Sequence, residues 1–210
     1  IPLDAPITSD FKITGGRVQA DFNEYNLWKL QGKGDKDFIL ANPSSAISVY
    51  LGNKMLRRGY NLMREEVEGL EKAPDDPERF ATFLRNCALA KLTAKGNSIV
   101  NLPLNDINGK ACELSEVIPT GKYVLVDFWA TWCGPCVAAI PGIKELAERF
   151  PEDLVVIGVS CDTDLNAWKV AIEKKQAKWA QYVLTKQGYK DFLEKYQISG
   201  VPYFLILDKE

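Results

Sequence analysis

The residues best suited to chemistry are Cys133 and Cys136, which are separated by two residues in the run WATWCGPC at positions 129–136. A strand-forming segment, 123–128, comes before the run, and an amphipathic segment with helical spacing follows it. One thiol is therefore expected at a helix N-terminus, where free backbone N–H groups and the helix dipole favour a thiolate. The second thiol would lie within reach of a mixed disulfide formed by the first. This is the geometry that thiol–disulfide exchange requires.

Three interpretations of this pair compete. A zinc half-site would need a second cysteine pair, whereas Cys87, Cys112 and Cys161 are single cysteines in separate segments. A static structural disulfide fits the spacing, although a two-residue gap at a helix start would leave that disulfide strained and labile. A redox dithiol fits the spacing, the strand-to-helix context and the flanking tryptophans, and we favour it. The three single cysteines are interpreted as small buried apolar residues, and none is nominated as a site.

Composition excludes several classes of function. The 210 residues include 26 basic and 28 acidic side chains, for a net charge of −2, so nucleic acid and anionic membranes are not expected as partners. The chain has no histidine, which excludes histidine-based catalysis and metal sites that need imidazole. No apolar stretch approaches the roughly 18 residues that cross a bilayer. The first residues show no signal peptide, as would also be true of a mature or trimmed form.

The first part of the sequence, residues 1–96, is predicted to be a β-hairpin followed by helices. Segments 11–13 and 17–22 alternate apolar and polar residues around Thr14-Gly15-Gly16, a pattern typical of a hairpin. Residues 44–95 have helical spacing, with Ser44 or Ser45 as the first cap and Asp75-Asp76-Pro77 as the start of a second helix. This indicates a helical hairpin with Cys87 on its buried face.

The second part, residues 97–210, alternates strands and helices. Segments 102–107 and 110–114 flank Asn108-Gly109, a strong hairpin turn. The remaining predicted strands are 123–130, 154–160 and 201–207, and the predicted helices are 136–150, 162–176 and 189–196. Buried strands that alternate with helices indicate an α/β sandwich.

Asp127 interrupts an otherwise apolar strand. At a strand edge its side chain would simply reach water. Its neighbours Val126 and Phe128 instead suggest a central strand, where an unpaired carboxylate is costly and its pKa rises. Because the chain lacks histidine, Asp127 is the best candidate for moving a proton near the cysteines.

These residues resemble a known family. Segment 126–136 resembles the thioredoxin active-site segment almost letter for letter, Pro141 matches the kink of the helix that follows, and 198–202 resembles the family's cis-proline loop. The leading hairpin and the longer middle insertion are more similar to the TlpA/ResA branch, thioredoxin-like proteins of the bacterial envelope. The resemblance covers about residues 97–208. It implies a central mixed sheet flanked by helices, preceded by a β/helical extension.

The resemblance also implies roles for the two cysteines and for the aspartate. Cys133, nearer the helix start and more exposed, would be the attacking thiolate. Cys136 would resolve the mixed disulfide, and the pair would alternate between dithiol and disulfide. Asp127 would accept the proton of the inner cysteine.

Substrate binding is implied around the same pair. The Val201–Pro202 peptide bond would be cis and would face Cys133, with the Val201 backbone pairing with an extended peptide. Trp132 would form part of the docking surface. Gly134 and Pro135 leave the sulfurs uncovered, and in the family a Gly-Pro pair accompanies reducing members.

The resulting hypothesis is a thiol–disulfide oxidoreductase that reduces protein disulfides and is recharged by an upstream electron-donor thiol protein. No metal or organic cofactor is expected, because the electrons reside in the sulfurs. A thiol peroxidase and a non-catalytic interaction module of the same fold are the alternatives. The branch implies a periplasmic or cell-envelope location, with a tether through a missing N-terminal segment, whereas a cytoplasmic protein is the alternative.

One departure from the family stands at the end of the sequence. A thioredoxin fold normally continues after the proline-led strand into an antiparallel edge strand and a covering helix. This sequence stops at Glu210. The domain is therefore expected either to lack these two elements or to have the gap covered by the N-terminal half.

Overall fold

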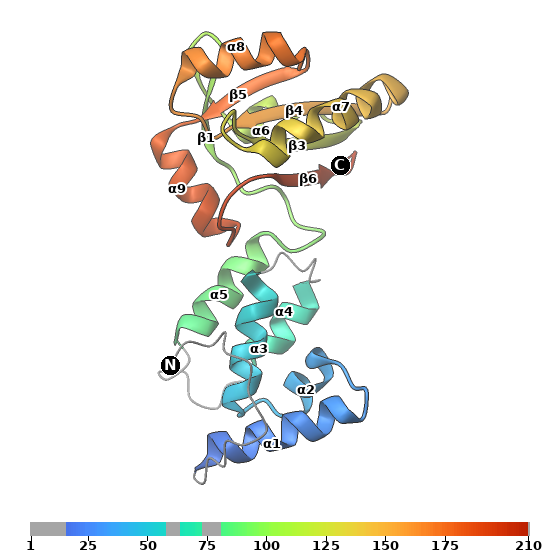
Figure 1. The fold of residues 1–210 in the computed structure, drawn as a ribbon, viewed down its shortest axis with the longest axis vertical. Coiled ribbons are helices and arrows are strands. Elements are labelled where there is room, and N and C mark those ends of the chain that lie inside the picture. The colour runs from blue at the N-terminus through green and yellow to red at the C-terminus, as the bar shows by residue number, and fades with distance from the viewer. Residues whose placement is uncertain (1–15, 58–63, 73–80, 210) are drawn as a thin grey trace. The chain divides into compact units, whose positions relative to one another are not determined.

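A computed structural model describes residues 16–57, 64–72 and 81–209 (Figure 1). The chain divides into two compact units, residues 1–91 and residues 92–210. The strand expected at 11–13 and the helix cap expected at 75–77 lie outside the described residues.

The first unit contains helices and no strands within the residues that the structure describes. Its helices are α1 Arg17–Leu30, α2 Asp35–Ala41, α3 Ala46–Arg57, α4 Arg64–Glu71 and α5 Ala81–Leu92. Apolar side chains from α2 to α5 form one buried cluster, which includes Phe38, Leu51, Val67, Phe83 and Cys87. Cys87 is buried in this cluster, as its helical spacing predicted.

The strand predicted at residues 17–22 is wrong, because these residues begin α1. The alternation there contains only three apolar residues, Val18, Ala20 and Phe22. The contacts that hold the segment instead follow helical spacing. Asp21 accepts a hydrogen bond from the Ala46 N–H at 3.1 Å, and the Tyr25 hydroxyl and the Trp28 indole also bond to residues of the same unit. A face with period 3.6 therefore outweighs a short run with period 2.

The second unit is a mixed six-stranded sheet with helices, which confirms the predicted α/β thioredoxin-like architecture. Its strands are β1 Pro103–Asp106, β2 Ala111–Glu113, β3 Tyr123–Trp129, β4 Leu154–Ser160, β5 Ala180–Leu184 and β6 Tyr203–Leu207. Its helices are α6 Leu114–Val117, α7 Gly134–Arg149, α8 Leu165–Lys175 and α9 Lys186–Lys195. The strand order is β2-β1-β5-β4-β3-β6.

Register explains how the sheet is assembled. Strands β3, β4 and β5 run parallel, while β6 pairs antiparallel with β3 and β1 pairs antiparallel with β5. The β1–β2 hairpin turns at Gly109, where a φ of 85° favours glycine. Strand β5 was not predicted, because it is short and its buried Gln181 breaks the apolar run.

The two faces of the sheet are covered by different helices. Leu125 of β3 clusters with Ile143 of α7, so odd positions of β3 face α7. Phe128 points the other way and stacks on Phe192 of α9, with ring centroids 4.2 Å apart. Asp127 shares its face with Leu125 and therefore lies on the side of the sheet that α7 covers.

Candidate active site

The central strand β3 carries the cysteine segment to one edge of the sheet. All of its residues after Tyr123 are buried, and strands β4 and β6 pair with it on either side. Just past the end of the strand, the Cys161 N–H donates to the Trp129 carbonyl at 2.8 Å, and the Cys133 N–H donates to the Ala130 carbonyl at 3.1 Å. The loop between β3 and α7 is thus fixed by its own backbone and by the residues that follow β4.

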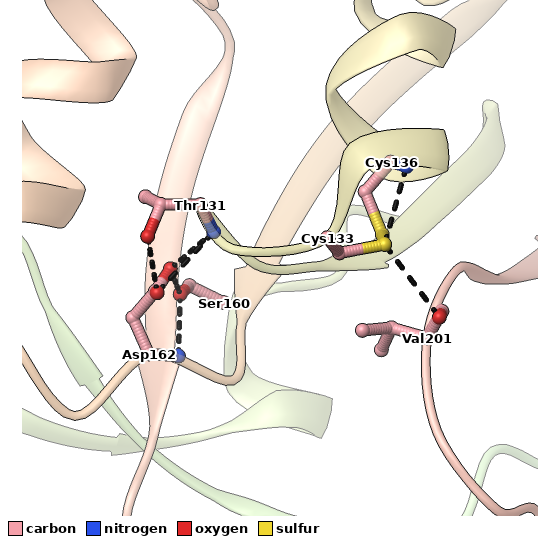
Figure 2. Close-up of a disulfide and its surroundings, with 6 residues drawn as sticks. All are labelled: Thr131, Cys133, Cys136, Ser160, Asp162 and Val201. Atoms are coloured by element: carbon pink, nitrogen blue, oxygen red, sulfur yellow. Dashed lines mark hydrogen bonds between the residues drawn. A yellow bond between two sulfur atoms is a disulfide. The ribbon is translucent and has the colours of Figure 1, made fainter.

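Cys133 is the N-cap residue of α7, and its sulfur is joined to that of Cys136 in a disulfide (Figure 2). The Cys136 N–H points at the Cys133 Sγ, with 3.2 Å between the two atoms. A free N–H of the first helical turn is therefore aimed at the outer sulfur, where it would stabilise a negative charge. Pro135 fits at the start of the helix, because the N–H that it lacks would have no partner within the helix.

The surroundings of the pair differ on their outer and inner sides. Cys133 is 6% exposed and Cys136 only 1%, so the order of exposure agrees with the prediction although both residues are largely covered. Gly134 and Pro135 are exposed, and the Trp132 side chain is 65% exposed. The outer side of the pair therefore has an exposed aromatic ring beside Cys133, whereas Cys136 is almost fully buried.

The proline loop before β6 faces the outer sulfur. The Val201 carbonyl oxygen lies 3.6 Å from the Cys133 Sγ (Figure 2). The Val201–Pro202 peptide bond is cis, as the family resemblance implied. Val201 is 68 residues further along the chain than Cys133, and the antiparallel pairing of β6 with β3 brings the two residues together.

Asp127 is buried in β3, where Gly158 of β4 and Phe204 of β6 pair with it. Its side chain is 2% exposed, and its Oδ1 atom has no hydrogen-bond partner among the residues that the structure describes. Burial raises the pKa of this carboxyl to about 7, since charge is poorly solvated in the sheet. The central-strand interpretation of Asp127, with its raised pKa, is therefore confirmed.

The other cysteines have a different character. Cys87 and Cys161 are buried free thiols, and Cys112 is a partly buried free thiol. Burial, with the nearby carboxylates of Asp162 and Asp127 adding to it, raises the pKa of Cys161 to about 12. Across residues 16–57, 64–72 and 81–209, no three His, Cys, Asp or Glu side chains are grouped to hold a metal ion.

Sequence reasoning missed a polar cluster beside the site, formed by Thr131, Ser160 and Asp162 (Figure 2). It also missed Gln181, whose side-chain oxygen accepts a hydrogen bond from the Trp129 indole at 3.2 Å. A signal for the first was available. Residues that follow neighbouring parallel strands meet at the same edge of a sheet, and Asp162 follows β4 as Thr131 follows β3.

None of the helices within the described ranges combines the length and the apolar character needed to cross a membrane.

Comparisons with known proteins agree with the geometry of the second unit. A family model described as thioredoxin-like matches residues 121–210. The chain is 30% identical over 115 residues to the thiol-disulfide oxidoreductase ResA of Bacillus cereus, covering 55% of this chain and 64% of that protein. It is 44% identical over 52 residues to thioredoxin of Mycolicibacterium smegmatis, covering 25% of this chain and 46% of that protein. The chain thus spans about half to almost two thirds of these relatives.

A solved structure is also similar. The thioredoxin domain of a thiol-disulfide oxidoreductase from Bacteroides vulgatus superposes with a TM-score of 0.51 at 35% sequence identity. The match covers 56% of this chain and 83% of that structure.

Proposed function

Because the chain belongs to the thioredoxin-like family of thiol–disulfide oxidoreductases, we propose that it reduces disulfides of protein partners through Cys133 and Cys136. The observation that carries this proposal is the pairing of the two sulfurs at the start of α7, with the Cys136 N–H directed at the Cys133 Sγ. An outer sulfur that can hold a negative charge, next to an inner sulfur that can close on it, is what exchange requires.

Cys133 acts first. In the reduced protein its thiolate attacks one sulfur of the partner's disulfide. A Cys133–partner disulfide forms, the partner's own S–S bond breaks, and the second partner sulfur leaves as a thiolate that takes a proton from water. The helix N-terminus favours this step, because it stabilises the thiolate at Cys133.

Cys136 completes the transfer. Its thiol gives up a proton and attacks the Cys133 Sγ. The Cys133–Cys136 disulfide forms, the mixed disulfide breaks, and the partner sulfur leaves as a thiolate that is then protonated. Two electrons have passed from the dithiol to the partner. A donor thiol protein must then reduce the Cys133–Cys136 disulfide before the next cycle.

Asp127 is proposed as the acceptor of the Cys136 proton. It lies on the sheet face that α7 covers, and Cys136 is in the first turn of that helix. With a pKa of about 7, the carboxyl is partly ionised near neutral pH and can take up a proton there. A carboxyl with an ordinary pKa would be a weaker base.

Substrate binding is proposed around the outer sulfur. An extended peptide would pair with the Val201 backbone, since that carbonyl already faces Cys133 and Pro202 directs the chain away into β6. Trp132 would supply an exposed apolar contact. Gly134 and Pro135 would leave room for the partner, and a Cβ on Gly134 would meet nothing within 4 Å.

The cellular setting is part of the same proposal. The partners would be proteins with disulfides, and the donor would be another thiol protein. The resemblance to the TlpA/ResA branch favours a location outside the cytoplasm, in the periplasm or cell envelope. Protein fractionation of the native cells with an antibody to this chain would test the location, and recovery in the cytoplasm alone would contradict it.

Insulin-disulfide reduction with dithiothreitol as electron donor tests the activity. We expect this protein to accelerate the precipitation of the insulin B chain. Cys136→Ser should instead accumulate a covalent Cys133–insulin adduct on a non-reducing gel, because the resolving thiol is missing. A protein that neither reduces insulin nor forms this adduct would contradict the proposal. Peroxide turnover far above insulin turnover would favour a thiol peroxidase.

The direction of transfer is tested by equilibrating the Cys133–Cys136 pair with glutathione. We expect a reduction potential of about −270 mV, which is typical of a reducing thioredoxin. A value of about −120 mV, which is typical of strong disulfide oxidants, would reverse the proposed direction of electron transfer.

A further inference from the structure

The polar cluster beside the disulfide centres on the carboxylate of Asp162, which is 5% exposed and follows β4. Oδ1 accepts a hydrogen bond from the Thr131 hydroxyl at 2.6 Å, and Oδ2 accepts one from the Ser160 hydroxyl at 2.7 Å. The Thr131 N–H also donates to this carboxylate, at 3.2 Å to Oδ1 and 3.0 Å to Oδ2. Three donors from two segments therefore converge on one carboxylate.

The chemistry of the cluster requires a carboxylate. The Asp162 N–H donates to the Ser160 Oγ at 2.9 Å, so the Ser160 hydroxyl is left to donate its own hydrogen to Asp162. Each group that faces Asp162 is a donor, and an ionised carboxylate can accept at both oxygens. Asparagine would turn an NH₂ group toward one of these donors. The pattern thus selects aspartate rather than a polar residue of the same shape.

The cluster also holds the loop that ends at Cys133. Thr131 stands two residues before Cys133, and the intervening Trp132 is exposed and gives the loop little anchorage. Together with the bond from the Cys161 N–H to the Trp129 carbonyl, the Asp162 cluster ties the start of this loop to the end of β4 (Figure 2). From Cys133 onward, α7 and the disulfide define the backbone.

We propose that Asp162 is a positioning residue for the redox reaction. Its hydrogen bonds to Thr131 keep Cys133 at the N-terminus of α7. This inference rests on the proposed dithiol chemistry. These hydrogen bonds matter most in the reduced protein, where no S–S bond restrains the Cys133 sulfur. If Cys133 moves away from Cys136, the disulfide closes less readily. If Cys133 moves away from the helix terminus, it attacks a partner more slowly.

The main test compares Asp162→Ala with Asp164→Ala. Asp164 is two residues further on and caps α8 by accepting hydrogen bonds from the Asn166 and Ala167 N–H groups at 3.0 Å. These bonds do not involve the loop that ends at Cys133. Both variants lose hydrogen bonds to one carboxylate. We expect Asp162→Ala to lower the equilibrium constant for disulfide formation against glutathione, and the rate of insulin attack, by about 10-fold each. Asp164→Ala should change both by less than about twofold, while its melting temperature falls.

A second pair of variants separates positioning from folding. Thr131→Val keeps the side-chain shape and removes only the hydroxyl donor, and we expect about a threefold loss in both redox measurements. Thr131→Ser restores a hydroxyl and should recover most of that loss. If Asp162→Ala does not fold, this pair decides the question. Redox values in both Asp162→Ala and Thr131→Val that equal those of the unmodified protein would overturn the inference.

The unmodified protein distinguishes the two proposals. If it fails to reduce insulin and shows no glutathione equilibrium, the proposed function itself is wrong. If it performs both reactions and Asp162→Ala matches Asp164→Ala, only the positioning role of Asp162 is wrong.

Discussion

The parallel strands β3 and β4 end at the same edge of the sheet, and each is followed by a cysteine within four residues. Cys133, after β3, caps a 16-residue helix and accepts a hydrogen bond from a helix N–H. Cys161, after β4, has no helix at its own position, because α8 begins only at Leu165. Burial is the main cause that raises the pKa of its thiol, and the nearby carboxylates of Asp162 and Asp127 add to it.

This contrast shows that the exposed fraction alone does not separate the two thiols. Cys133 and Cys161 are 6% and 8% exposed, so they are nearly equal in access to water. They differ in the charges that surround each sulfur. A helix N-terminus stabilises a thiolate, whereas adjacent carboxylates and apolar surroundings favour the neutral thiol. In the proposed function, position relative to a helix start therefore decides which cysteine performs the exchange.

The largest expected effect is on turnover. Cys133→Ser should lower insulin reduction by at least about 1,000-fold, because a hydroxyl cannot replace a thiolate nucleophile. Cys161→Ser should change turnover by less than about twofold, since it keeps the backbone N–H that bonds to Trp129 and removes a thiol with no assigned role. Equal losses of insulin reduction in the two variants would mean that Cys133 and Cys161 do not differ in their role.

Alkylation offers a direct measure of the same contrast. With the pKa of Cys161 near 12, its thiolate fraction at neutral pH is small, so iodoacetamide should label it slowly. In the reduced protein we expect Cys133 to react at least about 100-fold faster than Cys161. Mass spectrometry of peptides from a labelling time course measures both rates. Comparable rates would mean that the surroundings of Cys161 do not suppress its ionisation.

Asp127→Asn tests whether the pKa of the buried Asp127 carboxyl is raised. The folded pKa of Asp127 is about 7 and the unfolded value is 3.8, so between these pH values the unfolded chain binds fewer protons. Stability from the neutral carboxyl is present below pH 4 and is lost as pH rises through 7. We expect the free energy of unfolding of the unmodified oxidised protein, relative to Asp127→Asn, to fall by about 3 kcal/mol from pH 5 to pH 8.

Urea titrations of both proteins at the two pH values measure this difference. Insulin reduction by Asp127→Asn should also slow by about 10-fold, in keeping with the loss of a proton acceptor. A difference in stability that does not change with pH would show that the pKa of Asp127 is ordinary.

The smallest expected effect lies within β4. A Cβ at Gly158 would collide with the Gln181 side chain, which accepts from the Trp129 indole. Gly158→Ala should therefore lower the free energy of unfolding by about 2 kcal/mol. Gly142→Ala in α7 is the control, because its Cβ would meet nothing within 4 Å. Since alanine favours a helix more than glycine does, this substitution should raise the stability of the helix by about 0.5–1 kcal/mol. A neutral Gly158→Ala would mean that Gln181 relocates freely.

Parts of the fold that depend on neighbouring residues were predictable. The Asn108-Gly109 turn, the apolar strands β3 and β4 and the helix after Cys133 are each specified by a local pattern. Predictions failed where the pattern was short. The alternation in residues 17–22 predicted a strand, whereas the contacts of Asp21 and Tyr25 hold this segment as a helix. Strand β5 was not predicted, because the polar Gln181 interrupts its apolar residues.

The sequence alone pointed to the cysteine pair that we propose as reactive and to the buried acid, because both follow from residue type within one strand and one helix start. Only the tertiary structure revealed that Asp162 bonds to the loop before Cys133, and it also brings Val201 to Cys133, as the family resemblance implied. Val201 lies just before β6 and Asp162 just after β4, 68 and 29 residues further along the chain than Cys133. Their approach depends on the pairing of β6 and β4 with β3, and strand pairing is set by the packing of the whole sheet.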